Sequence, residues 1–173
     1  MRIKMESLKN ILLKIYISLT SFNRYTSEEY GHKAYNNKNY ELAADMLFIP
    51  AENGDIQSQI TLGIMYENGQ GVPQNHAEAA KWYKKAAVQG SSNGQFYLSL
   101  LYKSGLGVPF SPTMAYVLES LSAAQGHKIA CKNRNLSLEK LERNQVSEGQ
   151  KITLSWHVGE DFPTCSDFNH FEE

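Results

Sequence analysis

The feature that most constrains the fold of this chain is a segment that the sequence repeats. The stretch GQGVPQNHAEAAKWYKKAAVQG at 69–90 returns as GLGVPFSPTMAYVLESLSAAQG at 105–126. A shift of 36 residues lays 55–90 onto 91–126 without a gap. Eleven positions then carry the same residue: Gln59/Gln95, Leu62/Leu98, Tyr66/Tyr102, Gly69/Gly105, Gly71/Gly107, Val72/Val108, Pro73/Pro109, Ala79/Ala115, Ala87/Ala123, Gln89/Gln125 and Gly90/Gly126. A fixed period of this length is typical of stacked repeats, in which each repeat buries its apolar face against a neighbour.

A fainter copy of the pattern precedes the two clear ones. In the same ungapped register, Tyr30 falls on Tyr66 and Asn39 falls on Asn75. A shift in the other direction places Ala130 on Ser58, after which the pattern fades. The sequence therefore predicts about three repeats of one period.

Each repeat is predicted to contain two helices separated by a turn. In the middle repeat the first helix, 57–68, has small and apolar residues at helical spacing, and the second, 76–89, has an alanine-rich face. Gly69 ends the first helix and Asn75 caps the second. The residues expected to be buried are Ser58, Leu62, Met65 and Tyr66 on the first helix and Ala79, Ala80, Tyr83, Ala86 and Ala87 on the second.

The glycines of Gly-x-Gly-Val-Pro could either hold a phosphate or turn the backbone. A phosphate-binding P-loop needs Gly-x4-Gly-Lys followed by Ser or Thr, and a dinucleotide site needs Gly-x-Gly-x2-Gly after a strand. Neither GQGVPQN nor GLGVPFS has that lysine or third glycine, and both follow a helical pattern. We therefore interpret the glycines as structural turns. The positions concerned are Gly69, Gly71, Gly90, Gly105, Gly107 and Gly126.

The pattern of the middle repeat resembles the Sel-one-like repeat, a relative of the tetratricopeptide repeat. The residues that carry the resemblance are Ser58, Leu62, Gly63, Tyr66, Gly69, Gly71, Val72, Trp82, Tyr83, Lys85, Ala86, Ala87 and Gly90. The copy at 91–126 departs from the pattern at Ser99 and at Leu118-Glu119, and the first copy lacks Gly-x-Gly-Val. The segment 136–156 is similar to the closing helix that follows the last repeat in short bacterial members of the family.

This resemblance implies an all-α fold: a right-handed α-solenoid of about three helix-turn-helix repeats with a C-terminal capping helix. The expected repeats are 26–54, 55–90 and 91–126, and closing helices are expected over 127–156.

The two ends of the chain lie outside the repeats. Residues 1–25 have basic residues before an apolar run, as a signal peptide does, but their helical spacing also fits an N-terminal capping helix. Lys14 interrupts the apolar run, whereas Leu13 and Ile17 spoil the polar face of a capping helix. The balance favours a signal peptide, and hence a periplasmic or secreted protein over a cytoplasmic one. Residues 157–173 form an acidic tail, and no apolar run in the body of the chain predicts a membrane span.

The residues that could carry chemistry are few. Only the tail gathers possible metal ligands, His157, Asp161, Cys165 and His170, and it lacks the close pairs typical of structural zinc. No metal, cofactor or catalytic residue is therefore predicted. Cys131 and Cys165 could form one disulfide in an oxidising compartment. The balance of 17 basic and 18 acidic residues, without an aromatic and basic pattern, predicts no nucleic-acid partner.

A partner is expected to bind the concave face of the stack, on the stripe of each first helix opposite the core stripe. The residues of this stripe are Gln57, Ile60, Thr61, Ile64 and Glu67, and then Asn93, Phe96, Tyr97, Leu100 and Lys103. The apolar members could instead pack between repeats. Tyr97 is the preferred contact because its ring supplies area and its hydroxyl tolerates water. Glu67 and Lys103 could set a charge preference at the rim.

Three functions are left open. The leading hypothesis, which the family resemblance implies, is a non-enzymatic scaffold or adaptor that binds a partner protein or peptide and acts as a monomer. The first alternative is an immunity protein that neutralises a cognate secreted bacterial toxin, as some short bacterial members of the family do. The second alternative is a metal-dependent hydrolase that uses the C-terminal tail.

Overall fold

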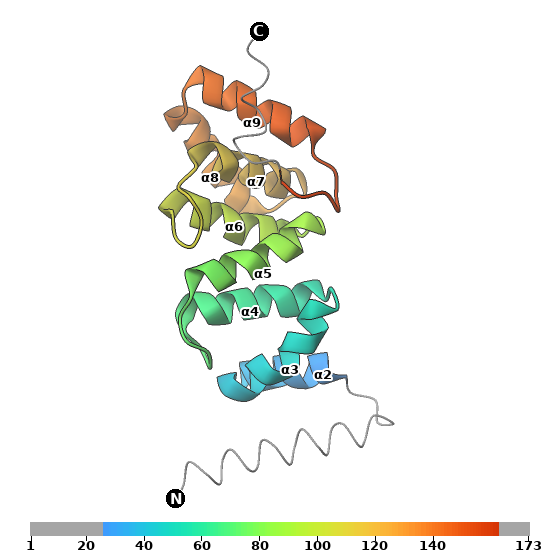
Figure 1. Cartoon of the computed structure of the whole chain (residues 1–173). Coiled ribbons are helices and arrows are strands. Elements are labelled where there is room, and N and C mark those ends of the chain that lie inside the picture. The colour runs from blue at the N-terminus through green and yellow to red at the C-terminus, as the bar shows by residue number, and fades with distance from the viewer. Residues whose placement is uncertain (1–25, 163–173) are drawn as a thin grey trace, which may run out of the picture. The chain divides into compact units, whose positions relative to one another are not determined.

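The computed structural model describes residues 26–162, and within this range every regular element is an α-helix (Figure 1). The helices are α2 (Ser27–Asn36), α3 (Tyr40–Glu52), α4 (Ile56–Asn68), α5 (His76–Val88), α6 (Ser92–Ser104), α7 (Pro112–Ala124), α8 (Lys128–Lys140) and α9 (Arg143–Ser155). The predicted all-α repeat fold is confirmed. Across the described range, each helix is too short or too polar to cross a bilayer.

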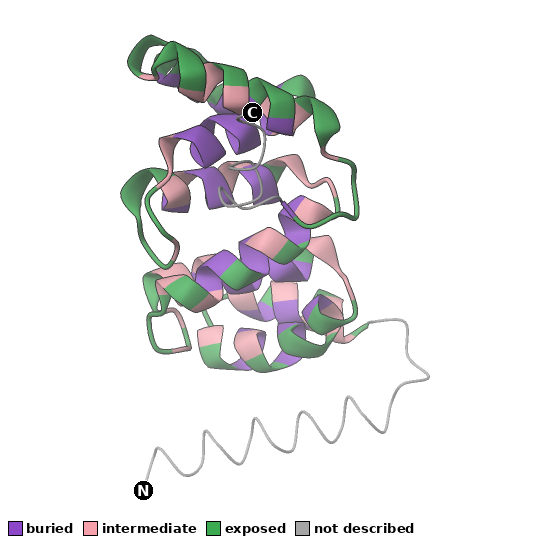
Figure 2. Cartoon of the chain, turned by 45° about the horizontal axis from the view of Figure 1, so that its top comes forward, coloured by how far each residue is buried: buried purple, intermediate pink, exposed green. Residues whose placement is uncertain are grey.

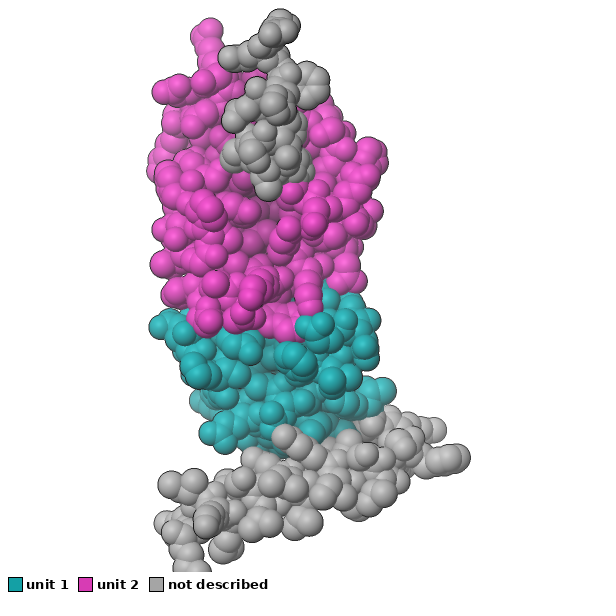
Figure 3. All heavy atoms as spheres, in the orientation of Figure 1, with its two compact units in different colours: residues 1–74 teal, residues 75–173 magenta. Residues whose placement is uncertain are grey.

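The chain divides into two compact units, residues 1–74 and 75–173, which Figure 3 colours separately. In unit 1, α3 contacts both α2 and α4. In unit 2, α5 contacts α6, and α7 contacts α6, α8 and α9. The helix α7 is the centre of the second core, and most of its residues are buried (purple in Figure 2).

The helices recur at the period that the sequence predicts. The first residues of α4 and α6 are 36 positions apart, and so are those of α5 and α7 and those of α6 and α8. In the middle repeat, the expected limits 57–68 and 76–89 differ from the observed helices by one residue each. The predicted core of that repeat is buried, except that Tyr66 is half-buried.

The first hairpin departs from the ungapped register. The last residues of α2 and α4, Asn36 and Asn68, are 32 positions apart, whereas the first residues of α3 and α5, Tyr40 and His76, are 36 apart. The connection 37–39 lacks the Gly-x-Gly-Val part of the turn, so four residues are missing from it. Tyr30 therefore does not take the place of Tyr66, and the prediction of an ungapped register is wrong for α2.

The closing segment consists of two helices and not of a single helix. The helix α8 keeps the repeat period, so the pattern continues beyond Ala130. Only two residues, Leu141 and Glu142, join it to α9, and both have extended backbone. The N–H of Glu142 then donates to the Oε1 atom of Gln145 at 3.0 Å, at the start of α9. The expected closing helix over 136–156 is thus divided between the end of α8 and α9.

The second glycine of each Gly-x-Gly turn lies directly against the start of the second helix of the preceding repeat. Gly71 and Gly107 both have φ +71°, in the left-handed region that favours glycine. A Cβ on Gly71 would overlap the backbone of Tyr40 at the start of α3, and a Cβ on Gly107 would overlap that of His76 at the start of α5. The six glycines predicted as turns all have positive φ. Close packing is therefore a second reason for glycine at these two positions, beside the left-handed backbone.

Polar side chains that recur at the repeat period form hydrogen bonds with the backbone at the helix ends. The N-caps Asp55, Ser91 and His127 each accept a hydrogen bond from a backbone N–H three residues on. Inside the helices, the buried amides of Gln59 and Gln95 donate to the carbonyl oxygens of Ala51 and Ala87, the equivalent residues of the preceding helices. Each of these carbonyl oxygens lies near a helix end and also accepts a hydrogen bond from a backbone N–H, that of Gly54 or that of Gly90.

Candidate functional site

The part of the predicted binding stripe that lies in unit 2 is displayed by α6. Ser91 caps the start of this helix and Gly105, in the left-handed conformation, ends it. Gln95, Leu98, Ser99 and Leu101 are buried, which leaves the opposite side facing outward. On that side Asn93 and Lys103 are exposed, and Phe96, Tyr97 and Leu100 are half-buried. We call these five residues the α6 face.

The corresponding stripe on α4, in unit 1, offers less surface. Gln57 is exposed, and Ile64 and Glu67 are half-buried. Ile60 and Thr61 are each only 4% exposed, and the Thr61 hydroxyl donates to the carbonyl oxygen of Gln57 at 2.9 Å. Ile60 and Thr61 therefore cannot serve as the partner contacts that were predicted. Packing, the alternative left open for the apolar residues of the stripe, accounts for Ile60.

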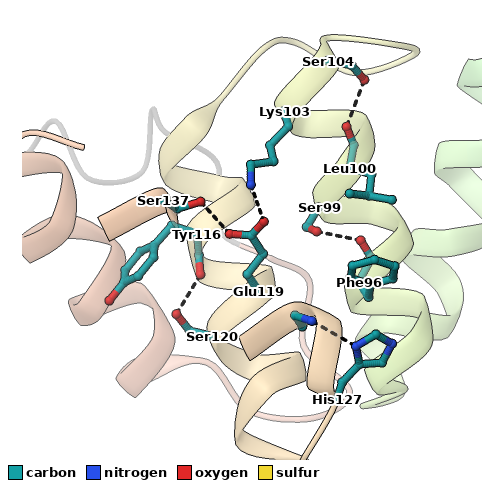
Figure 4. Close-up of polar contacts among 11 residues, drawn as sticks. Phe96, Ser99, Leu100, Lys103, Ser104, Tyr116, Glu119, Ser120, His127 and Ser137 are labelled. Carbon is teal, nitrogen blue, oxygen red and sulfur yellow. Dashed lines mark hydrogen bonds and ion pairs between the residues drawn. The ribbon is translucent and has the colours of Figure 1, made fainter. Parts of the chain in front are cut away.

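Aromatic rings support the middle of the α6 face. The ring of Tyr97 stacks on the buried ring of Tyr83 from α5, with centroids 5.1 Å apart and planes 17° apart. Phe96 contacts Tyr97, with ring centroids 5.6 Å apart. Phe96 also stacks on His127, the N-cap of α8, at 4.5 Å (Figure 4). The Nδ1 atom of His127 accepts a hydrogen bond from the N–H of Ala130, which fixes the imidazole. The face is thus a set of rings held in place from two neighbouring helices.

A buried carboxylate anchors the charged end of the α6 face. Glu119 on α7 has no solvent exposure. Lys103 Nζ lies 2.7 Å from its Oε1 atom, and the Ser137 hydroxyl donates to its Oε2 atom at 2.7 Å (Figure 4). Burying an ionised carboxylate is costly unless it is paired and hydrogen-bonded, and both conditions are met here. Lys103 therefore neutralises Glu119, and Glu119 in turn compensates the positive charge of Lys103 at the rim.

Sequence reasoning missed Glu119, although a signal for it was present. Glu119 stands 36 positions after Tyr83, so it replaces a buried aromatic residue of the repeat pattern. Both side chains have no solvent exposure. A charged residue at a position where the repeat buries a ring needs compensating partners nearby, and Lys103 and Ser137 supply them.

The tail residues proposed as metal ligands are only partly within the described range. His157 Nδ1 lies 3.6 Å from Glu160 Oε2, and Asp161 pairs with Lys84 at 3.0 Å. Cys165 and His170 lie outside the described residues, and so does the proposed disulfide partner of Cys131. Cys131 itself is a half-buried thiol near the carbonyl oxygen of Ala123.

Comparison with known proteins connects this geometry to a family. The sequence matches the model of the Sel1 repeat over residues 56–91 and again over 92–127. Each match is one full period and begins at the first residue of α4 or α6. Residues 56–127 of the chain are therefore two consecutive Sel1 repeats.

Two solved structures share the Sel1 repeat architecture with this chain. A protective antigen present in uropathogenic Escherichia coli strains, which displays an SLR fold, has a TM-score of 0.70 and 25% sequence identity, over 73% of this chain and 28% of the antigen. A Sel1 repeat protein from Oxalobacter formigenes has a TM-score of 0.60 and 33% identity, over 62% of this chain and 44% of that protein. The identification that the repeat residues suggested is confirmed.

Curated relatives share shorter stretches of Sel1 sequence. DAP3-binding cell death enhancer 1 of Rattus norvegicus is 47% identical over 49 residues, which are 28% of this chain and 10% of that protein. The exopolysaccharide production negative regulator of Rhizobium leguminosarum bv. viciae is 40% identical over 62 residues, 36% of this chain and 23% of that protein. The chain thus spans about a tenth to a quarter of these relatives. Sel1 repeat proteins generally mediate protein–protein interactions, and the family is typically a non-catalytic scaffold.

Proposed function

We propose that this Sel1 repeat protein is a non-enzymatic scaffold that binds a partner protein or peptide through the α6 face. The observation that supports the proposal is the half-buried ring pair of Phe96 and Tyr97. Tyr97 stacks on Tyr83, and Phe96 stacks on His127. Aromatic side chains contribute large contact areas at a small cost in conformational entropy, and they dominate binding hot spots.

Preorganisation is the physical advantage of this face. Stacking restricts the rings before a partner arrives, so little side-chain freedom remains to be lost on binding. Because Glu119 compensates the charge of Lys103, apolar and aromatic contact contributes more to the interaction than net charge does. The expected partner segment therefore presents apolar side chains to the α6 face.

Site-specific photo-crosslinking tests whether the α6 face is in contact with a partner. Asn93 is exposed on this face, and a photoreactive phenylalanine at this position would sit beside the rings. The same residue at Lys132, which is exposed on α8, is the matched control. We expect one dominant protein adduct from the Asn93 variant in native cells and none of that adduct from the Lys132 variant. Equal adducts from both positions would contradict the proposal. The immunity-protein alternative is the case in which the adduct contains a toxin.

A further inference from the structure

A second site lies in unit 1, where three side chains with metal-binding groups come together. Glu28 and His32 are four residues apart on α2, a spacing that places both on one face of a helix. Asp55 is the N-cap of α4, more than twenty residues further along the chain. One ligand atom from each of the three residues lies within 4.8 Å of the other two, and all three residues are half-buried.

The hydrogen bonding of these residues leaves ligand capacity unused. The Nε2 atom of His32 is buried and has no hydrogen-bond partner among residues 26–162. A buried polar atom without a partner costs free energy and calls for an explanation, such as an ion. Asp55 uses Oδ2 to accept a hydrogen bond from the N–H of Ser58 at 2.6 Å, which orients the carboxylate and leaves Oδ1 for another bond. Carboxylates that bind metals are commonly oriented in this way by a second hydrogen bond.

We infer that Glu28, His32 and Asp55 form a binding site for a divalent transition-metal ion of the zinc type. One imidazole nitrogen with two carboxylate oxygens suits Zn²⁺, whereas Ca²⁺ and Mg²⁺ take oxygen ligands. Bonds of about 2 Å to a tetrahedral ion bring the ligand atoms to about 3.5 Å from one another. The three ligand atoms lie within 4.8 Å of one another, so an ion would have to draw them closer together on binding.

The ion would join two helices that are not consecutive in the sequence. It links the first turns of α2 to the start of α4, and α3 lies between them along the chain. An ion that binds the folded chain more tightly than the unfolded chain raises the apparent stability of the fold. Zinc binding at this site therefore stabilises unit 1, and this effect does not depend on the α6 face.

The test is a titration of the full chain, stripped of metal with a chelator, with Zn²⁺ alone, followed by calorimetry and thermal unfolding. We expect one Zn²⁺ per chain and a higher melting temperature with Zn²⁺ than with Ca²⁺. Asp55→Asn keeps an N-capping side chain and Glu28→Gln keeps the shape, so both variants should fold. Each should weaken Zn²⁺ binding at least about 10-fold, and so should His32→Gln.

The matched control is His76→Gln. His76 is also half-buried, and its buried Nδ1 atom likewise has no hydrogen-bond partner in the part of the chain that the structure describes, but it does not belong to the group of three. Its replacement should leave Zn²⁺ binding unchanged. The inference is wrong if wild-type chain binds no Zn²⁺, if the three variants bind it as well as wild type, or if Ca²⁺ stabilises the chain and Zn²⁺ does not.

Discussion

The ammonium group of Lys103 lies 2.7 Å from a carboxylate oxygen of Glu119, a side chain with no exposure to solvent. The pair joins the outer face of α6 to the buried side of α7 in unit 2. The same carboxylate accepts a hydrogen bond from Ser137 on α8, so three successive helices meet at one ionised group. Lys103, a residue of the proposed binding face, therefore also stabilises the core of unit 2.

Replacing Lys103 by methionine should destabilise the chain. The substitution leaves the buried carboxylate of Glu119 with Ser137 alone, and an uncompensated buried charge is strongly unfavourable. Because the lysine side chain is 36% exposed, solvent screens part of the interaction, and we expect a loss of about 1–3 kcal/mol in the free energy of unfolding. Urea unfolding of the variant and of the wild-type chain measures this loss in the free energy of unfolding. Adding Glu119→Gln should recover part of the loss, and strictly additive effects of the two substitutions would contradict the pairing.

The second glycine of the turn should tolerate no side chain. In Gly107→Ala the new Cβ meets the backbone of His76 and the residue must keep a positive φ. Gly126→Ala is the matched control, because Gly126 has φ +84° but a Cβ added there would meet no atom of the described residues within 4 Å. We expect about 1–2 kcal/mol of destabilisation for Gly126→Ala from the backbone alone, and at least about 2 kcal/mol more for Gly107→Ala. Gly71→Val should behave as Gly107→Ala does. Equal losses at positions 107 and 126 would show that close packing is unimportant.

Two asparagines at equivalent positions should differ in their contribution to stability. Asn75 accepts hydrogen bonds from the N–H groups of Ala77 and Glu78 at the start of α5. Asn39 precedes α3 but makes no side-chain capping bond. Asn75→Ala should therefore cost about 1 kcal/mol, and Asn39→Ala less than about 0.5 kcal/mol. Thermal unfolding of the two variants beside wild type measures the difference, and similar losses would be inconsistent with the observed caps.

Much of the fold could be predicted from the sequence because its signals are local. Glycines with positive φ end α4 and α6, and Asn75 caps α5, so the limits of the middle repeat were within one residue of the structure. The limits of the first hairpin were harder to predict, because its shortened turn shifts α2 by four residues relative to the later repeats. The coincidence of Tyr30 with Tyr66 concealed this gap.

The candidate site was less predictable because burial depends on neighbouring helices. Helical spacing placed Ile60 and Phe96 on the same stripe of successive repeats, yet Ile60 is 4% exposed and Phe96 is half-buried. Spacing also placed Lys103 at the rim, without showing that Glu119 lies opposite it. Pairs such as Tyr83 and Tyr97, on different helices, become neighbours only through the packing of α5 on α6.

The most direct test of the scaffold account is the affinity of the crosslinked partner, once identified, for two single variants of the full chain. Tyr97→Ala removes the ring that stacks on Tyr83, whereas Phe110→Ala removes a ring that is 67% exposed in the turn between α6 and α7. Calorimetric titration should show a dissociation constant at least about 10-fold higher for Tyr97→Ala than for wild type, with circular dichroism unchanged. Phe110→Ala should bind as wild type does. Unchanged affinity in Tyr97→Ala, or an equal loss in Phe110→Ala, would contradict a partner site on the α6 face.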